Sequence, residues 1–455
     1  YLEQKLATHF LITAKNIRNR RKADIKFNID TLQNLILGKE GYRLVINRKG
    51  IHITAAGTAG IFYGIQTVLQ LIEKDSGRYF LPHVEIFDKP RFVWRAFLLD
   101  EARSFKGSAA VKQLLDEMAL LKMNVFHWHL TDDQGWRIQI AKYPRLTAVS
   151  SGPITAIKGK TFYTQEEIKE IVGYASARHI MIVPEIEMPG HASAAIAAYP
   201  NLGVEKKPIT MPQRQGIYTN IFDVSDSLIL TFIHDVLDEV MTLFPSKTIH
   251  IGGDEVKYEP WENSLRVSAF MKENNILSPA ALQLWFVSGI SQYLHAKGCR
   301  TMGWNDMLGK HNSSTIGENL SQDAIVHFWL GSPTLINLAV SAGFDVVNSF
   351  HEYTYLDYSY KSISLEKAYS FEPIPALLNE QFDNKILGLG CQMWGEHIPT
   401  IEKMQYQVFP RIAAYAEVGW TAKANKNFGR FKQSLLKIAN HWKGNGIAVD
   451  ISVIQ

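Results

Sequence analysis

Two adjacent acids, Asp254 and Glu255, follow an apolar segment and two glycines within the stretch 247–256. On a regular strand, neighbouring side chains point to opposite faces, so these carboxylates could not serve one substrate. Gly252 and Gly253 would let the backbone leave strand geometry there, because glycine reaches angles closed to other residues. A carboxylate pair at the carboxyl end of a buried strand is typical of barrel enzymes. A helix N-terminus with two dipole-compensating acids is the alternative.

The segments that would position such a pair alternate between strand and helix patterns after residue 92. Eight short apolar segments are candidate strands: 95–100, 124–130, 179–187, 248–252, 300–305, 324–330, 345–350 and 386–394. Helical patterns lie between them, as at 108–122 and at 165–177, where Thr164 and Glu167 form a capping pair. Eight strand–helix alternations over about 350 residues predict an α/β fold, a (β/α)8 TIM barrel.

The first 90 residues predict a separate, small α+β domain in front of the barrel. Its expected elements are a strand at 23–30, a hairpin of 42–47 and 51–54, a helix at 58–73 and a strand at 81–86. The segment 88–91 is the predicted boundary, which divides the chain into domains 1–90 and 91–455. A basic cluster at 18–22 lacks interleaved aromatic residues and glycines, so we predict a solvated surface and no nucleic-acid partner.

Composition is that of a globular protein, with 46% hydrophobic and 20% charged residues and a formal net charge of +4 over 455 residues. No apolar run approaches the roughly 18 residues that span a bilayer, so we expect no membrane insertion. Cys299 and Cys391 lie far apart in apolar segments and are predicted to be buried thiols.

The chain begins at Tyr1 without an apolar leader. We expect a periplasmic or secreted protein rather than a cytoplasmic one, with its export signal outside this sequence; the oligomeric state stays open.

Polar and aromatic residues gather directly after the predicted strands, where a barrel holds its active site. They are Arg103, Asp132, His191, Asp254, Glu255, Trp304, Asp306, Trp329, Tyr355, Asp357, Trp394 and Glu396. Indole rings beside hydrogen-bonding acids suit a sugar, whose C–H face stacks on aromatic rings while its hydroxyls need polar partners. Four further tryptophans are predicted to lie in the core: Trp94, Trp136, Trp285 and Trp442.

Four motifs make the chain similar to a known family. They are His250-Ile-Gly-Gly-Asp-Glu255, Asp132-Asp-Gln-Gly-Trp-Arg137, Pro189-Gly-His191 and, in the small domain, Gly60-Ile-Phe-Tyr-Gly-Ile-Gln66. The barrel resembles glycoside hydrolase family 20, the β-N-acetylhexosaminidases, and the likeness covers nearly the whole chain. It implies an enzyme that removes terminal, non-reducing β-linked N-acetylglucosamine or N-acetylgalactosamine from an oligosaccharide or glycoconjugate, without a cofactor.

The resemblance implies a substrate-assisted, retaining mechanism, an exception to the usual pair of catalytic carboxylates. The substrate's own 2-acetamido oxygen attacks the anomeric carbon and forms an oxazolinium intermediate. Glu255 would protonate the leaving oxygen and later activate water. Asp254 would accept a hydrogen bond from the acetamido N–H and stabilise the developing positive charge.

The same resemblance assigns roles to the other residues at the strand ends. His191 and Asp132 match residues of a polar relay that tunes the protonation of the catalytic glutamate. The sugar contacts are matched by Arg103 for the hydroxyls, Trp304, Trp329 and Trp394 for the aromatic walls, Tyr355 for the acetamido oxygen, and Asp357 and Glu396 for further polar contacts. Two positions depart from the family: Glu187 stands where Asp is usual, and Ser104 where His is usual.

Three alternatives remain open at this stage. The first is a relative that releases a disaccharide, as lacto-N-biosidases do. The second is a sugar-binding relative without activity, against which the retention of Asp254 and Glu255 argues. The third is a metal-dependent amidohydrolase, suggested by His127 and His129 on one strand face, but only His191 offers a further ligand at a later strand end. We therefore predict no metal, and we interpret His250 as a structural residue within its strand.

Overall fold

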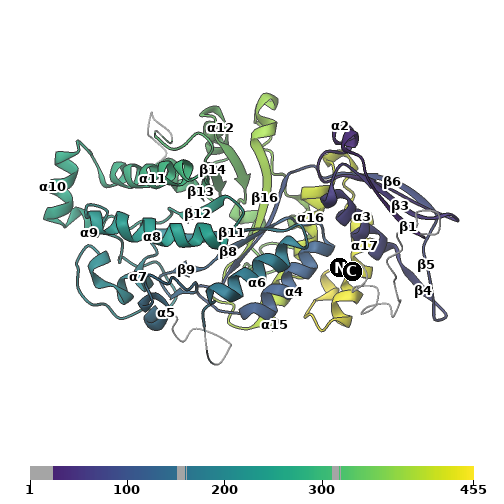
Figure 1. Cartoon of the computed structure of the whole chain (residues 1–455), viewed down its shortest axis with the longest axis horizontal. Coiled ribbons are helices and arrows are strands. Elements are labelled where there is room, and N and C mark those ends of the chain that lie inside the picture. The colour runs from purple at the N-terminus through teal and green to yellow at the C-terminus, as the bar shows by residue number, and fades with distance from the viewer. Residues whose placement is uncertain (1–23, 151–158, 160, 310–316, 318, 455) are drawn as a thin grey trace.

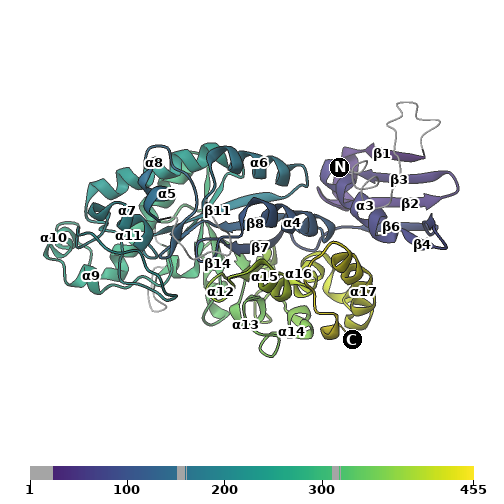
Figure 2. The ribbon, with the colours of Figure 1, turned by 90° about the horizontal axis from the view of Figure 1, so that it is seen from below.

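The computed structural model describes residues 24–150, 159, 161–309, 317 and 319–454. The basic cluster at 18–22 therefore lies outside the described residues. Figures 1 and 2 show a small sheet at one end of the molecule and a barrel surrounded by helices at the other. No helix in the described part of the chain is long and apolar enough to cross a membrane.

The predicted TIM barrel is confirmed, because eight parallel strands close into one sheet. Its strands are β7 (Trp94–Asp100), β8 (Val125–His129), β11 (Met181–Met188), β12 (Thr248–Gly252), β13 (Arg300–Trp304), β14 (Ile325–Phe328), β15 (Asp345–Asn348) and β16 (Ile386–Met393). The last strand pairs with the first, from Gly388 beside Trp94 to Met393 beside Leu99. All eight predicted strands are present, with boundaries that differ by only a few residues.

Helices follow the strands and cover the outside of the barrel (Figure 1). The longer ones are α4 (Gly107–Leu120), α6 (Gln165–Ser176), α8 (Ser227–Leu243), α10 (Leu265–Glu273), α11 (Pro279–Ala296), α12 (Thr334–Ser341), α15 (Ile401–Val408), α16 (Arg411–Trp420) and α17 (Phe428–Gly444). Shorter ones are α5 (Arg145–Ser150), α7 (Ser193–Ala198), α9 (Glu259–Glu262), α13 (His351–Thr354) and α14 (Leu365–Ser370). The predicted capping box of Thr164 and Glu167 is present at the start of α6, where each side chain satisfies a backbone N–H of the other residue.

The small sheet precedes the barrel and has the strand order β1-β3-β2-β6. Its strands are β1 (Ile25–Ile29), β2 (Tyr42–Asn47), β3 (Gly50–Ala55) and β6 (Val84–Asp88), with the short helix α2 (Asn34–Leu37) and the hairpin of β4 (Glu73–Asp75) and β5 (Arg78–Phe80) beside them. Helix α3 (Thr58–Leu71) packs on β2 and β3. A side chain at Gly64 would come within 2.6 Å of Ile53, so the helix lies this close only with glycine there.

Buried polar contacts join the small sheet to the barrel. Arg95, in the first barrel strand, is fully buried and pairs with Glu40 at 2.9 Å. The Trp420 indole at the end of α16 donates to Asp88 at the end of β6, at 2.8 Å. Removal of one partner of a buried ion pair leaves an uncompensated charge, which costs about 3–5 kcal/mol. The chain therefore holds these two parts together with contacts that tolerate little change.

The inside of the barrel is layered. Its lower layer is aliphatic and aromatic, and consists of Trp94, Ala96, Val125, Val183, Met302, Ile325 and Val347. Polar residues follow two positions later on several of these strands, and the loops that carry the predicted site begin above them. The prediction for Trp285 is wrong: this indole on α11 is 38% exposed, although Trp94, Trp136 and Trp442 are buried as predicted.

Candidate active site

The acid pair lies at a bend that begins where β12 ends. Gly252 and Gly253 have φ angles of +66° and +90°, and Glu255 itself has a φ of +50°. This left-handed backbone turns the chain out of strand geometry, as the two glycines predict. Asp254 and Glu255 thereby approach one common group, with carboxylate oxygens 3.7 Å and 3.5 Å from Nε2 of His191.

His191 connects the acid pair to a buried carboxylate. It follows β11, and its Nδ1 lies 3.1 Å from Asp132 and 3.4 Å from Asp133. Burial alone would lower the pKa of His191, but Asp132 and the neighbouring hydrogen bonds raise it well above its ordinary value. Burial would likewise raise the pKa of Asp132, yet Arg103 and His191 hold it well below its usual range. The pair is therefore a buried imidazolium and carboxylate next to the two acids.

Asp254 shares its surroundings with other carboxyl groups. Burial raises the pKa of Asp254 to about 8, against the opposing charge of His191 and with help from Asp306 and Glu255. Burial also raises the pKa of Glu187 well above its usual range, and the charge of Asp254 adds to this shift. Because these closely spaced acids cannot all ionise, some of them keep their protons at neutral pH. Acids that keep protons at neutral pH are what general acid–base catalysis needs.

Arg103 lies on the other side of Asp132. Its Nη2 is 2.8 Å from Asp132 and its Nη1 is 3.2 Å from Asp100. The guanidinium carbon lies 5.3 Å from the ring centre of Trp394. These partners hold the guanidinium in one orientation between a carboxylate pair and an indole face, as a clamp for hydroxyl groups requires.

Four aromatic residues form a continuous wall at the ends of four consecutive strands. Trp304 lies 6.3 Å from Trp329 and 5.8 Å from Trp394 between ring centres, and Tyr355 lies 6.3 Å from Trp329 and 6.0 Å from Trp394. The indole N–H of Trp304 donates to Glu185 and that of Trp329 donates to Asp306, both at 2.9 Å. Each of these two indoles is therefore held by its N–H edge, and its face stays available for apolar contacts.

Unpaired polar atoms are directed to the same region. Oδ1 of Asp254, Oδ1 of Asp357 and Nε1 of Trp394 are buried without a hydrogen-bond partner among the described residues. Burial raises the pKa of Asp357 to about 7, and the charge of Glu396 adds to the shift. The charge of Glu396 also reaches Arg103, so Glu396 lies near both groups. Buried polar atoms without partners are costly and rare, and here they are suited to the hydroxyl and amide groups of a sugar.

The two positions that depart from the family have clear local surroundings. Glu187 lies directly against Gly252, since a Cβ at residue 252 would be 1.7 Å from its Oε2. The absence of a side chain at Gly252 is what makes room for this carboxyl group. Ser104 donates from its hydroxyl to the backbone oxygen of Gly395 at 2.8 Å, and so joins the loops after the first and last barrel strands.

Several residues of the site were not predicted from the sequence. Asp133 accepts hydrogen bonds from the backbone and hydroxyl of Ser193 and so anchors the loop that carries His191. His129 lies between Asp132 and Glu185, at 2.8 Å and 2.6 Å. For His129 the signal is the alternation of His127 and His129 inside an otherwise apolar strand, which marks the interior face; Asp133 lies in a turn beyond the strand, where no such alternation exists.

Three histidines beneath the site are close enough to be considered as metal ligands. One nitrogen each of His127, His250 and His327 lies within 4.8 Å of the others, and all three residues are buried. Of these, the sequence-based metal hypothesis had considered only His127, together with His129 and His191. Hydrogen-bonding partners engage the ring nitrogens: His250 Nε2 lies 3.3 Å from His327 Nδ1, and His327 Nε2 lies 2.8 Å from the Ser349 hydroxyl. The backbone N–H of Gly252 donates to His250 Nδ1 at 3.1 Å, so both ring nitrogens of His250 and of His327 have hydrogen-bonding partners.

The barrel is closed and has adjacent acids after its fourth strand, with an imidazolium–carboxylate pair behind them and indole walls around them. This is the architecture of a glycoside hydrolase. Comparison with family models identifies which one. Residues 92–423 match the catalytic domain of glycosyl hydrolase family 20, and residues 1–89 match domain 2 of that family. The chain belongs to glycosyl hydrolase family 20, which confirms the resemblance carried by the motifs.

Individual relatives agree with the family. The chain is 36% identical over 444 residues to a β-hexosaminidase of Porphyromonas gingivalis, covering 90% of this chain and 54% of that protein. It is 32% identical to the solved structure of a β-N-acetylhexosaminidase from Bacteroides fragilis, with a TM-score of 0.84 over 95% of this chain and 87% of that one. An exo β-N-acetylglucosaminidase from Vibrio harveyi, solved with N-acetylglucosamine, is 30% identical, with a TM-score of 0.87 over 99% of this chain and 72% of that one. The chain thus spans only about half the length of the Porphyromonas relative.

Proposed function

We propose that the protein is a retaining, exo-acting β-N-acetylhexosaminidase that removes terminal, non-reducing N-acetylglucosamine or N-acetylgalactosamine. The observation that carries the proposal is the bend after β12, which places Asp254 and Glu255 on the same side of one imidazolium. The nucleophile and acid of an ordinary retaining glycosidase flank the scissile bond from two directions, whereas these two acids lie beside one nitrogen of the same imidazole. A substrate that brings its own nucleophile removes the need for such a placement.

In the first step the carbonyl oxygen of the 2-acetamido group attacks the anomeric carbon, and the bond to the leaving oxygen breaks. Glu255 gives its proton to that oxygen, and an oxazolinium ion remains on the sugar. Asp254 accepts a hydrogen bond from the acetamido N–H, which becomes more acidic as positive charge develops. In the second step Glu255 takes a proton from water, whose oxygen attacks the anomeric carbon and restores the acetamido group with retained configuration.

The surrounding residues support these steps. His191, held by Asp132, lies within 3.7 Å of both acids and stabilises the negative charge that Glu255 carries between the steps. Trp304, Trp329 and Trp394 provide apolar faces for the sugar ring and the acetamido methyl. Tyr355 is buried in the same wall, where its hydroxyl can donate to the acetamido oxygen.

A panel of aryl glycosides tests the proposal. We expect hydrolysis of β-N-acetylglucosaminides or β-N-acetylgalactosaminides and no comparable rate on the matching β-glucosides, which lack the amide nucleophile. Equal rates on both would refute participation by the substrate. An aryl lacto-N-bioside in the same panel tests for disaccharide release, and an assay with a chelator tests for a metal; we expect neither disaccharide release nor loss of activity.

A further inference from the structure

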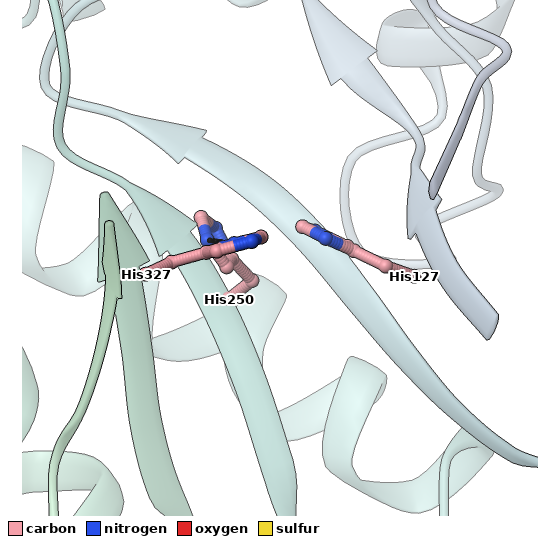
Figure 3. Close-up of side chains that lie close together, drawn as sticks. All are labelled: His127, His250 and His327. Carbon is pink, nitrogen blue, oxygen red and sulfur yellow. Dashed lines mark hydrogen bonds between the residues drawn. The ribbon is translucent and has the colours of Figure 1, made fainter. Parts of the chain in front are cut away.

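A layer of polar side chains fills the barrel beneath the sugar site. Figure 3 shows His127, His250 and His327 pointing toward one another from β8, β12 and β14. Val125 and Ile325, two positions earlier on β8 and β14, belong to the aliphatic layer below. Barrel interiors are usually filled by branched aliphatic side chains. Polar residues in this layer therefore require partners for every buried nitrogen and oxygen.

Glu185 of β11 is the anion at the centre of this layer. Its carboxylate lies 2.9 Å from His127, 2.8 Å from His250 and 2.6 Å from His129. It also accepts the indole N–H of Trp304 at 2.9 Å. The side chain is fully buried, and the N–H groups of His129 and Trp304 donate hydrogen bonds to it in place of water. A buried charge with directed hydrogen bonds is held in one place more firmly than a surface charge.

On one side this network supports the wall of the sugar pocket. The Trp304 ring stacks on His327, with 4.2 Å between centres and an interplanar angle of 17°, and its edge is tied to Glu185. Its centre also lies 4.9 Å from that of His250. The position of Trp304 is therefore set by the layer beneath it and by the Glu185 carboxylate together.

On the other side the network reaches the acid pair. His129 has Glu185 on one ring nitrogen and Asp132 on the other, so both nitrogens carry protons and the ring is an imidazolium. Asp132 in turn holds His191 at 3.1 Å. The titratable groups around His129 are Glu185 and Glu187 of β11, Asp132 after β8, and Asp100 of β7.

We propose that Glu185 is a positioning residue for the reaction of the proposed function. It touches neither sugar nor scissile bond, and it acts on two sides of the pocket at once. It fixes Trp304 in the wall, and through His129 it fixes the Asp132–His191 pair beside the catalytic acids. Binding of the sugar and the acid–base steps thus depend on one carboxylate in the layer beneath the pocket.

Glu185→Gln is the decisive variant, because it keeps the size of the side chain and removes its charge. Val183→Ala is the matched control: it lies two residues earlier on the same strand, is fully buried, and belongs to the aliphatic layer. We expect Glu185→Gln to lower kcat/KM by about 100-fold, the size of effect that a misplacement of about 1 Å produces. Val183→Ala should lose stability and keep its kcat/KM.

The pH profile separates positioning from a general loss of structure. Without the Glu185 anion, the pKa of His129 falls toward its ordinary value near 6.5. We therefore expect the ratio of Glu185→Gln to wild-type kcat/KM to fall further as pH rises above 6.5. Glu185→Asp, which keeps the charge, should regain the wild-type pH dependence even where its rate is reduced. A folded Glu185→Gln variant with the kcat/KM and pH profile of Val183→Ala would overturn the proposal.

Nuclear magnetic resonance of the wild-type protein gives a test that needs no variant of Glu185. With ¹⁵N-labelled histidine, and with His129→Asn to assign the signal, we expect both ring nitrogens of His129 to be protonated at pH 7.5. A neutral His129 would overturn the proposal. A wild-type protein inactive on every acetamido glycoside would refute the proposed function instead, and the state of His129 would still decide on Glu185.

Discussion

Asp254 and Glu255 differ in how far each reaches into solvent, and this difference separates their roles. The Glu255 side chain is 32% exposed, against 13% for Asp254. The leaving part of a glycoside extends out of an exo-acting pocket, so the acid that protonates it must lie toward the opening. In the proposed reaction the acetamido group of the same sugar lies deeper in the pocket, beside the more buried Asp254.

Glu255→Gln tests the assignment of the acid. The variant should nearly abolish turnover of substrates with poor leaving groups, by about 10²–10⁴-fold, since general acid catalysis contributes that much. Aryl glycosides with acidic leaving groups need less protonation and should lose far less in the first step. The measurement is kcat/KM over a series of leaving groups. An equal loss across the series would exclude Glu255 as the acid.

The raised pKa of Asp254, about 8, predicts proton release when an acetamido sugar binds. A carboxylate that accepts the amide N–H is stabilised in its charged form, so binding lowers the pKa of this group. At pH 7 the free protein holds the proton and the complex gives it up, and affinity should therefore weaken as pH falls below about 8. Titration calorimetry of N-acetylglucosamine in buffers of different ionisation enthalpy measures the proton count. Asp254→Asn should abolish the release; persistence of the release in this variant would contradict the assignment.

At the scale of the strands and loops, the bend after β12 depends on two glycines whose surroundings differ. Both have positive φ, yet a Cβ at Gly252 would lie 1.7 Å from Glu187, whereas a Cβ at Gly253 would meet only Met307 at 3.8 Å. The same backbone strain can thus be introduced with and without displacement of Glu187.

Gly252→Ala should therefore lower kcat/KM by about 100-fold, because Glu187 and the start of the acid loop must shift. Gly253→Ala is the control: it carries the same roughly 1–2 kcal/mol cost of a left-handed alanine without the collision. Kinetics and thermal unfolding of both variants make the comparison. Similar losses of kcat/KM in the two would show that Glu187 does not support the acid pair.

Most of the fold could be predicted from the sequence because strand ends carry local signals. The glycines at the end of β12, the capping pair at the start of α6 and the polar runs after each strand all lie within a few residues of the element they mark. The acid pair and the aromatic wall follow from this, since parallel strands bring their carboxyl ends together. Trp285 was misplaced because a single indole carries no such signal.

The polar layer beneath the site could not be predicted in the same way. His127, His250 and His327 come from three strands of which no two are neighbours, and they meet only when the barrel closes with a particular stagger. That stagger is a property of the whole sheet, and no local pattern of residues specifies it. Glu185 likewise appears in the sequence as one acid among several near the end of β11.

For the molecule as a whole, this layer makes stability depend on pH in both directions. Burial lowers the pKa of His127 to about 4, although Glu185 opposes the shift. Burial would also lower the pKa of His129, but Glu185 and Asp132 raise it to about 10. Each imidazole has an ordinary pKa near 6.5 in the unfolded chain. At neutral pH the folded core thus contains His127 in its neutral form and His129 in its protonated form.

These two shifts act on opposite sides of pH 6.5. Between pH 6.5 and 4 the unfolded chain binds a proton at His127 that the folded protein does not bind. The free energy of unfolding therefore falls as pH falls, by about 3 kcal/mol over this interval. Between pH 6.5 and 10 the folded protein keeps a proton at His129 that the unfolded chain has lost. Stability therefore falls as pH rises, by about 5 kcal/mol over the whole interval.

We expect the contribution of these two histidines to the free energy of unfolding to be greatest near pH 6.5 and to decline on both sides. Urea denaturation at pH 5, 6.5 and 9 measures it as the difference between the wild type and variants of each histidine. In His129→Gln, the alkaline decline should shrink by up to about 1.4 kcal/mol per pH unit, which is one proton equivalent. His295→Asn is a surface control, since His295 is 61% exposed on α11 and its partner Asp323 lies outside this layer; the alkaline slope should keep its wild-type value. An alkaline slope that is the same in His129→Gln and in the wild type would show that His129 does not fold as an imidazolium. The charge that Glu185 stabilises would then have to lie elsewhere in the layer.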